Sequence, residues 1–237
     1  MITWDPTDPI LGPPIVDGQT TVLDARRFGD REYRFYRVPN IDRLLDEIDP
    51  KEWEKDERMP YWAELWRSGE ALATLLAATP LRGVRVLELG CGLGLPSIVA
   101  ASRGALVTAS DYIPDALELL AVNARLNGVD VRRVELDWRA PADVGRFDLV
   151  VAADVLYEQW QVDALVKMLA RTMAPAGRSI VVDPDRRTAK EFANAALFRG
   201  FRVARRVESG PDATAIHVYD LAWRDEPPPG HARPGRT

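Results

Sequence analysis

Glycines and carboxylates that follow strand-like runs are the residues of this chain best suited to bind a ligand. The stretch "VLELGCGLGL" (86–95) places Gly90, Gly92 and Gly94 directly after an apolar run. Glycine adopts unusual backbone dihedrals, and it lets the main chain approach a ligand closely because it has no Cβ. Many ligand classes use such a turn, so these glycines predict a binding loop without identifying its ligand.

The spacing of the glycines bears on two nucleotide-binding motifs. A dinucleotide fingerprint requires G-x-G-x-x-G, whereas here the third glycine comes one position early and Leu95 occupies its expected place. A P-loop is excluded because no Gly-Lys-Ser/Thr sequence follows.

Carboxylates stand near the ends of successive strand-like runs. Asp111 ends the second run, where its carboxylate can accept hydrogen bonds from both hydroxyls of a ribose, and Glu88 lies two residues before the first glycine. "LDW" ends the third run and places Asp137 and Trp138 where an adenine can be held and stacked. Each aspartate alone can be an ordinary turn residue. Together they favour a cationic nucleoside such as S-adenosylmethionine, because carboxylates attract a sulfonium and repel a pyrophosphate.

These side chains meet only if several strands end at one edge of a sheet. The predicted strands are 84–89, 106–110, 131–136, 147–153, 178–183, 201–207 and 215–223, and the predicted helices are 61–78, 96–104, 114–128, 159–174 and 188–198. Alternating strands and helices indicate an α/β, Rossmann-like, doubly wound seven-stranded sheet. Its last strand pair should be antiparallel because only the short "ESGPDA" joins the two strands. Ligands bind such sheets at the carboxyl ends of the strands.

The first 59 residues predict an N-terminal extension. Residues 1–19 are rich in proline and predict an irregular arm, residues around Phe28-Gly29-Asp30 predict the turn of a β-hairpin, and "IDRLLDEIDPKEW" predicts a short helix that stops near Pro50. We therefore expect an arm over 1–59, a domain built around the sheet over 60–223 and a disordered tail over 224–237.

The composition excludes several classes of protein. The net charge of −5 gives no overall electrostatic reason to bind nucleic acid or an anionic membrane. A single cysteine and two histidines exclude a disulfide framework and an ordinary Cys/His zinc site, so we expect no metal. No apolar run reaches the length of a membrane span, and the first residues lack the features of a secretion signal. These features predict a cytoplasmic protein, and we expect a monomer.

The order of the motifs resembles a known enzyme family. "VLELGCGLGL" followed by "SDY" resembles the class I, seven-stranded S-adenosylmethionine-dependent methyltransferases. With "LWRSGEALATLL", "NARLNG", "LDW" and "ADVLYE", the chain is similar to methyltransferase family 16 over about residues 60–222. That family includes protein-lysine methyltransferases, among them enzymes that act on the electron-transfer flavoprotein β-subunit and on chaperones.

The resemblance implies S-adenosyl-L-methionine as cofactor and assigns residues to it. The cofactor-binding set, with Glu88 from the strand pattern, is Trp62, Trp66, Glu88, Gly90, Cys91, Gly92, Gly94, Asp111, Tyr112, Asp137, Trp138 and Ala153. The glycine loop is expected beside the carboxypropyl group, Asp111 at the ribose and Tyr112 over the adenine. Trp62 and Trp66 are four residues apart and should share one helical face, although such a pair is more often core packing.

The family's acidic-x-x-aromatic motif maps to Asp154 and Tyr157 in "DVLY". A lysine ammonium, with a reference pKa of about 10.4, must lose a proton before it can accept a methyl group. We expect Asp154 to accept a hydrogen bond from the amine and orient it, and Tyr157 to offer an aromatic face to the nitrogen. Alternatively, Asp154 only caps a turn. The predicted function is N-methylation of a lysine in a protein substrate; the alternatives are a small-molecule N- or O-methyltransferase, a nicotinamide-dependent oxidoreductase and a cofactor-binding module without turnover.

Overall fold

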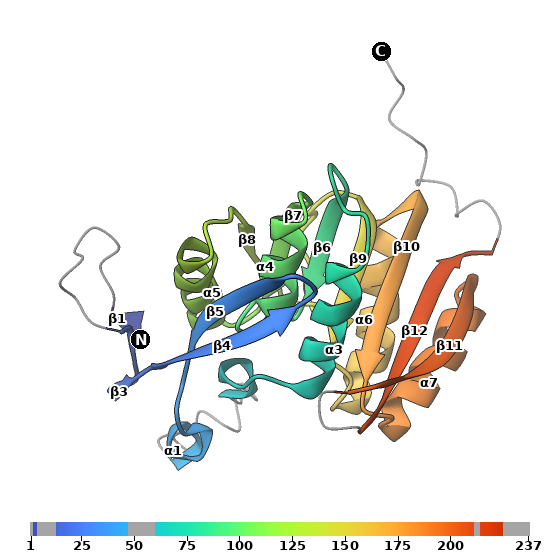
Figure 1. The fold of residues 1–237 in the computed structure, drawn as a ribbon. Helices are drawn as coiled ribbons and strands as arrows, with labels where there is room; N and C mark the ends of the chain where they lie inside the picture. Colours follow the sequence, from blue (N-terminus) through green and yellow to red (C-terminus); the bar gives the residue numbers. More distant parts are fainter. Residues whose placement is uncertain (1, 4–12, 47–59, 211–213, 225–237) are drawn as a thin grey trace.

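A computed structural model describes residues 2–3, 13–46, 60–210 and 214–224, and a seven-stranded sheet lies at its centre (Figure 1). The strands are β6 (Arg85–Leu89), β7 (Leu106–Asp111), β8 (Arg132–Glu135), β9 (Phe147–Ala153), β10 (Met173–Asp183), β11 (Phe201–Ser209) and β12 (Ala215–Trp223). Their spatial order is β11-β12-β10-β9-β6-β7-β8. The predicted doubly wound sheet is confirmed.

The pairing directions identify the part of the sheet where a ligand should bind. Strands β8, β7, β6, β9 and β10 run parallel, whereas β12 is antiparallel to both β10 and β11, so the last strand pair is antiparallel as predicted. From β6 the chain first builds outward through β7 and β8 and then returns to build β9 on the other side. The carboxyl ends of β6 and β9 therefore form the topological switch point, where such sheets bind ligands.

Helices cover both faces of the sheet. One face carries α3 (Arg67–Ala77), α4 (Leu95–Ser102) and α5 (Pro114–Leu126), and the other carries α6 (Gln159–Thr172) and α7 (Arg187–Phe198) (Figure 1). Alternate strand residues point to opposite faces. Ile180 and Val182 accordingly pack into the first core, and Val181 between them packs into the second. Because both faces are buried, the central strands are apolar runs rather than alternating ones.

The helix predicted over 61–78 is interrupted, and this part of the prediction was wrong. Residues Pro60–Ala63 form a 3₁₀ helix, η1, and α3 begins only at Arg67, with Trp66 in an extended conformation at its N-cap. Trp62 and Trp66 therefore do not share a helical face. The apolar spacing did not reveal the break because Trp62 and Ala63 pack into a separate cluster, against Leu93 of the glycine loop, instead of continuing the stripe of α3.

The predicted N-terminal hairpin is confirmed as β4 (Val22–Phe28) and β5 (Arg31–Arg37), paired antiparallel around a turn with Gly29 at φ 60°. Tyr33 and Phe35 alternate with exposed residues and are buried in the core beside α3, α4 and α5. The Tyr33 hydroxyl lies 2.6 Å from Ser102 Oγ at the end of α4. The hairpin thus lies across the helical layer, as Figure 1 shows in blue.

Two asparagines, Asn123 of α5 and Asn127 at its C-cap, pair with the backbone of β5. Asn123 Oδ1 accepts the Tyr36 N–H at 2.7 Å, and Asn123 Nδ2 donates to the Tyr36 carbonyl at 3.1 Å. One helical turn later, Asn127 makes the same pair of bonds to Arg34. The backbone N–H of Arg34 donates to Asn127 Oδ1 at 3.0 Å, and Asn127 Nδ2 donates to the Arg34 carbonyl. Four residues of helix rise about 6 Å and two residues of strand about 6.8 Å, so the two spacings match closely. Asn123 Nδ2 also approaches the Leu93 carbonyl at 3.4 Å, which connects the hairpin to the glycine loop.

The arm predicted as irregular contains short strands. Ile15–Val16 pairs with Gln19–Thr20 and with Ile2–Thr3, and the turn residues Asp17 and Gly18 both have positive φ, as a two-residue hairpin requires. The short helix α1 (Ile41–Asp46) confirms the helix predicted there. Pro50 and residues 225–237 of the expected tail lie outside the described residues. Within the described ranges, no helix is both long and apolar enough to cross a membrane.

Candidate active site

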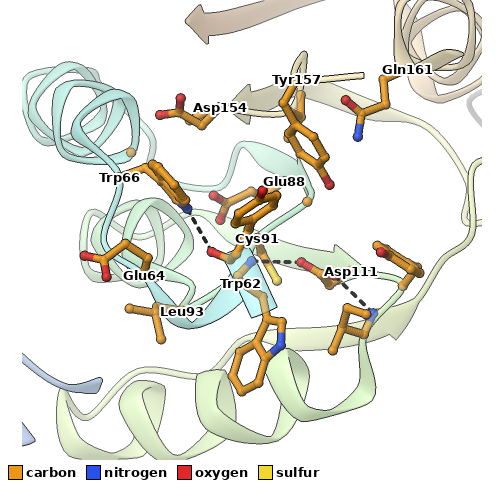
Figure 2. Close-up of a pocket in the computed structure, with 18 of the residues that line it drawn as sticks. Trp62, Glu64, Trp66, Glu88, Cys91, Leu93, Asp111, Asp154, Tyr157 and Gln161 are labelled. Atoms are coloured by element: carbon orange, nitrogen blue, oxygen red, sulfur yellow. Dashed lines mark hydrogen bonds between the residues drawn. The ribbon is translucent and has the colours of Figure 1, made fainter. Parts of the chain in front are cut away.

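A cavity of about 460 Å³ lies at the carboxyl ends of β6, β7 and β9, and all of the predicted site residues line it. Figure 2 labels some of them, among them Glu88, Asp111 and Tyr157. They are Trp62, Trp66, Glu88, Gly90, Cys91, Gly92, Gly94, Asp111, Tyr112, Asp137, Trp138, Ala153, Asp154 and Tyr157. The structure therefore brings together residues that span almost one hundred positions of the chain. The role of each residue stays a prediction.

The glycine loop lines the cavity with main chain, and its conformation requires glycine. Gly90, Gly92 and Gly94 have φ angles of 70°, 48° and 77°, in the left-handed region that L-residues with a Cβ rarely adopt. A Cβ on Gly90 would lie 2.7 Å from Val155 Cγ1, and one on Gly92 would lie 3.0 Å from the Trp62 carbonyl oxygen. Neither position has room for a side chain, so the backbone itself faces the cavity.

Asp111 connects the end of β7 to the glycine loop. Its Oδ2 accepts the Gly92 N–H at 2.9 Å, and its Oδ1 accepts the Ile113 N–H at 3.1 Å (Figure 2). Burial raises the pKa of the Asp111 carboxyl, while the hydrogen bond from Gly92 opposes this shift. A backbone hydrogen bond from Tyr112 also lowers the pKa of this carboxyl. Because a carboxylate has about four acceptor positions, Asp111 can still accept a further hydrogen bond, as the predicted contact with a ribose requires.

Glu88 is buried below the glycine loop and caps a helix. Its Oε2 accepts the Ser97 N–H at 2.9 Å and also the Ser97 hydroxyl, so it binds the first turn of α4. Burial raises the pKa of Glu88 to about 8, and the nearby Asp111 charge acts in the same direction. Glu88 therefore has a structural role that its place in the sequence did not reveal, in addition to lining the cavity.

The predicted adenine end of the cavity contains an arginine that was not predicted. Arg139 forms a two-pronged ion pair with Asp137, with nitrogen–oxygen distances of 2.8 to 3.0 Å. Its guanidinium also lies 5.8 Å from the ring centres of both Tyr112 and Trp160. The Asp137 carboxylate is thus engaged by Arg139. Nothing in the sequence marked Arg139 except its position after "LDW".

Three aromatic rings, those of Tyr61, Trp66 and Tyr157, contact one another and line the cavity. The Tyr61 ring lies edge-on to those of Trp66 and Tyr157, at centroid distances of 5.9 and 5.5 Å. Trp66 Nε1 donates to the Tyr61 carbonyl at 2.8 Å. Partial burial raises the pKa of Tyr157, so its hydroxyl stays protonated at neutral pH and can donate a hydrogen bond. Tyr61 was missed because it was assigned to the first turn of the longer predicted helix.

Asp154 has a backbone conformation that is unusual for a residue with a side chain. Its φ is 59°, and its N–H donates to the Val182 carbonyl at 3.0 Å. Oδ2 accepts the Ser68 N–H in the first turn of α3 at 3.2 Å, and Oδ1 accepts a hydrogen bond from Arg186 Nη1 at 2.8 Å. Figure 2 shows Asp154 on the same side of the cavity as Trp66 and α3. Asp154 therefore does act as a cap, but for α3 and not for the turn that follows it.

Cys91 and Ala153 also line the cavity. Cys91 is buried within the loop, and burial raises the pKa of its thiol well above the ordinary value, so the thiol stays protonated and unreactive. Ala153 lines the cavity at the end of β9. Across the described part of the chain, no group of three or more His, Cys, Asp or Glu side chains is arranged to hold a metal ion.

Comparison with known proteins identifies the family. The family model described as lysine methyltransferase matches residues 52–196. The electron transfer flavoprotein beta subunit lysine methyltransferase of Xenopus laevis is 36% identical over 71% of this chain and 70% of its own length. The mouse protein of the same name is 34% identical, and the match spans 51% of it. Protein N-lysine methyltransferase METTL21A of Danio rerio is 37% identical over 48% of this chain and 56% of its own length.

Solved structures share the fold at lower identity. A Thermus thermophilus 16S rRNA N2 G1207 methyltransferase in complex with AdoMet and guanosine matches with a TM-score of 0.59 and 20% identity, over 86% of this chain and 51% of that one. A ribosomal protein L11 methylase from Lactobacillus delbrueckii matches with a TM-score of 0.57 and 22% identity, over 68% and 81% of the two chains. With more than half of its residues matched by the family model, and with this fold, the chain belongs to the lysine methyltransferase family.

Proposed function

We propose that this protein transfers a methyl group from S-adenosylmethionine to the side-chain amine of a lysine in a protein substrate. The observation that carries the proposal is the convergence of the predicted cofactor residues and the Asp154–Tyr157 pair on one cavity at the switch point of the sheet. Family membership supports the same reaction class.

The cavity fits the proposed cofactor. Its volume of about 460 Å³ is within the range of small-molecule sites, roughly 300 to 1,000 Å³. The glycine loop leaves bare main chain where a Cβ would collide with Val155 or with Trp62. Asp111 has acceptor capacity for ribose hydroxyls, and Tyr112 and Trp138 supply aromatic surface for an adenine. When bound, S-adenosylmethionine supplies an electrophilic methyl group on a sulfonium.

Asp154 and Tyr157 are proposed to position the acceptor nitrogen. Asp154 can accept one more hydrogen bond at each oxygen, and the Tyr157 hydroxyl can donate one. The aromatic faces of Tyr61, Trp66 and Tyr157 provide an apolar channel, and desolvation in such a channel favours the neutral amine over the ammonium. These residues orient and dehydrate the lysine, and the free-energy gain comes from alignment of the reacting atoms.

A protein acceptor is favoured over a small molecule by the rim of the cavity. Trp66, Tyr157 and Trp160 are 37%, 39% and 41% exposed, although large aromatic residues are usually buried more deeply. Exposed aromatic residues around a pocket are typical of surfaces that bind another protein. The relatives named above act on proteins by name, which is consistent with this choice.

The test is methyl transfer from S-adenosylmethionine carrying a radiolabelled methyl group. The enzyme is incubated with a cell lysate, and separately with purified electron transfer flavoprotein β-subunit because relatives carry that name. We expect label on protein, and mass spectrometry should place it on lysine. Label confined to small molecules would instead establish the small-molecule alternative.

Two variants separate chemistry from binding. Asp154→Asn preserves the shape of the side chain but removes its charge, and it should lower turnover while leaving affinity for S-adenosylhomocysteine within about twofold. Asp163→Asn, on the exposed face of α6, is the matched control and should have no effect. Wild-type turnover in Asp154→Asn would remove this residue from catalysis.

We also infer that the protein acts in the cytoplasm as a monomer. The buried, protonated thiol of its one cysteine is consistent with a reducing compartment. Cell fractionation and light scattering test the two parts of this inference separately.

A further inference from the structure

Arg186 lies at the acceptor end of the cavity, in the segment between β10 and α7, and no motif predicted it. A single nitrogen, Nη1, donates to Asp154 Oδ1 at 2.8 Å and to Asp183 Oδ2 at 2.9 Å. The Arg186 N–H also donates to Asp183 Oδ1 at 2.7 Å. The guanidinium therefore bridges two carboxylates at the ends of the neighbouring strands β9 and β10.

Both carboxylates are nearly inaccessible to water. The Asp154 and Asp183 side chains are 7% and 1% exposed, whereas Arg186 is 29% exposed and lines the cavity. Buried like charges repel strongly unless an opposite charge lies between them. Although burial alone would lower the pKa of Arg186, its bonds to Asp154 and Asp183 raise it, so the guanidinium remains charged.

The position of Asp154 thus depends on two external donors. The Ser68 N–H fixes one oxygen from the α3 side, and Arg186 fixes the other from the β10 side. With its left-handed backbone, Asp154 has few other ways to maintain this orientation. Removal of Arg186 would leave one oxygen without its donor and two buried carboxylates without their shared counter-charge.

This arrangement matters for the proposed reaction. An isolated carboxylate beside a lysine favours the ammonium, which has no lone pair for methyl transfer. Two uncompensated carboxylates would favour the ammonium more strongly, and would bind it more tightly in an unreactive form. A bridging cation reduces this effect while leaving Asp154 able to accept a hydrogen bond.

We propose that Arg186 is a positioning residue for methyl transfer: it orients the Asp154 carboxylate and offsets its charge, so that the acceptor lysine binds as a reactive neutral amine. The inference rests on the proposed lysine methyltransferase function. It predicts a separation of kinetic parameters: without Arg186, the acceptor KM should be unchanged or lower while kcat falls.

The test compares Arg186→Gln with Arg186→Lys, using the protein that wild-type enzyme labels most strongly in the lysate. Arg186→Gln should lower kcat by about 10- to 100-fold, the order expected when a catalytic group is displaced. Arg186→Lys should restore most of the activity, because one nitrogen makes both side-chain contacts and a lysine ammonium can replace it. Arg187→Gln is the matched control, since its side chain is 83% exposed and lies 3.8 Å from Glu191 on the same helix, and Arg187 does not line the cavity.

Affinity for S-adenosylhomocysteine, measured by calorimetry, reports whether each variant retains its fold and cofactor site. Wild-type kcat in Arg186→Gln would overturn the inference. It would also be overturned if Arg186→Gln and Arg186→Lys both lost cofactor affinity together with activity, because the arginine would then serve the fold alone. Absence of protein label with the wild-type enzyme would refute the proposed function instead, so the two failures are distinguishable.

Discussion

The buried Glu88 makes a quantitative prediction about stability and pH. Its pKa rises from a reference of 4.5 to about 8 in the folded protein because of burial. Between these two values the folded state keeps the proton while the unfolded state has lost it. The free energy of unfolding therefore includes the full contribution of protonated Glu88 below pH 4.5. This contribution is lost progressively as the pH rises from 4.5 through about 8.

Glu88→Gln should remove this dependence. Glutamine has the shape of a protonated glutamate, and its carbonyl oxygen can still accept the Ser97 N–H that Glu88 now accepts at 2.9 Å. The free energy of unfolding of the variant, relative to wild type, should rise by about 1.4 kcal/mol per pH unit across this window. Over the whole interval the gain would reach roughly 5 kcal/mol, which is an upper value because the buried site can relax.

The assay is urea unfolding without cofactor, followed by circular dichroism, at intervals between about pH 5 and pH 9. Glu118→Gln is the matched control, since Glu118 is exposed on α5 and pairs with Arg133 at 3.6 Å. This control should not alter the slope of stability against pH. A difference between Glu88→Gln and wild type that stays constant over the range would refute the reasoning, because it would mean that Glu88 titrates normally.

Three further substitutions test the glycine loop, the hairpin contact and the ribose assignment. Gly90→Ala should destabilise the fold by about 1–3 kcal/mol in urea unfolding, because φ is 70° and the new Cβ would lie 2.7 Å from Val155; unchanged stability would contradict the close approach. Asn123→Ala should lower the free energy of unfolding by about 2–4 kcal/mol, because the N–H and the carbonyl of Tyr36 both lose their hydrogen-bond partner. Limited proteolysis should then cleave the hairpin sooner than in the wild-type protein. Asp111→Ala should weaken S-adenosylmethionine binding about 10-fold or more in calorimetry, and unaltered affinity would exclude Asp111 from ribose binding.

The central sheet could be predicted from the sequence because its strands are apolar runs separated by helices. Strands that are buried on both faces give such continuous apolar runs. Asp111 and Asp137 could be assigned to one site because strand ends at one edge of a parallel sheet meet in space. The N-terminal hairpin followed from the alternation of Tyr33 and Phe35 with polar residues and from Gly29 at its turn.

Features that depend on contacts between distant segments were not predictable in this way. The helix α3 begins at Arg67, and the N–H of Ser68 in its first turn donates to the Asp154 carboxylate. Because Asp154 lies far along the chain from Ser68, the local sequence does not reveal this contact. Arg186 and Arg139 occur among many surface arginines and have no periodicity or motif that distinguishes them. Their roles became visible only when the strand ends were assembled in space.

The bonds from Asn123 and from Asn127, the C-cap residue of α5, to the backbone of β5 have a consequence for the behaviour of the hairpin in concentrated solution. A two-stranded ribbon ordinarily presents a free edge that can recruit a strand from another molecule and begin aggregation. Here the Asn123 and Asn127 side chains form hydrogen bonds with the backbone N–H and carbonyl groups of Tyr36 and Arg34, the groups that a recruited strand would use. The helix thereby imitates a third strand, and the protein guards this edge against self-association with two side chains instead of an additional segment of chain.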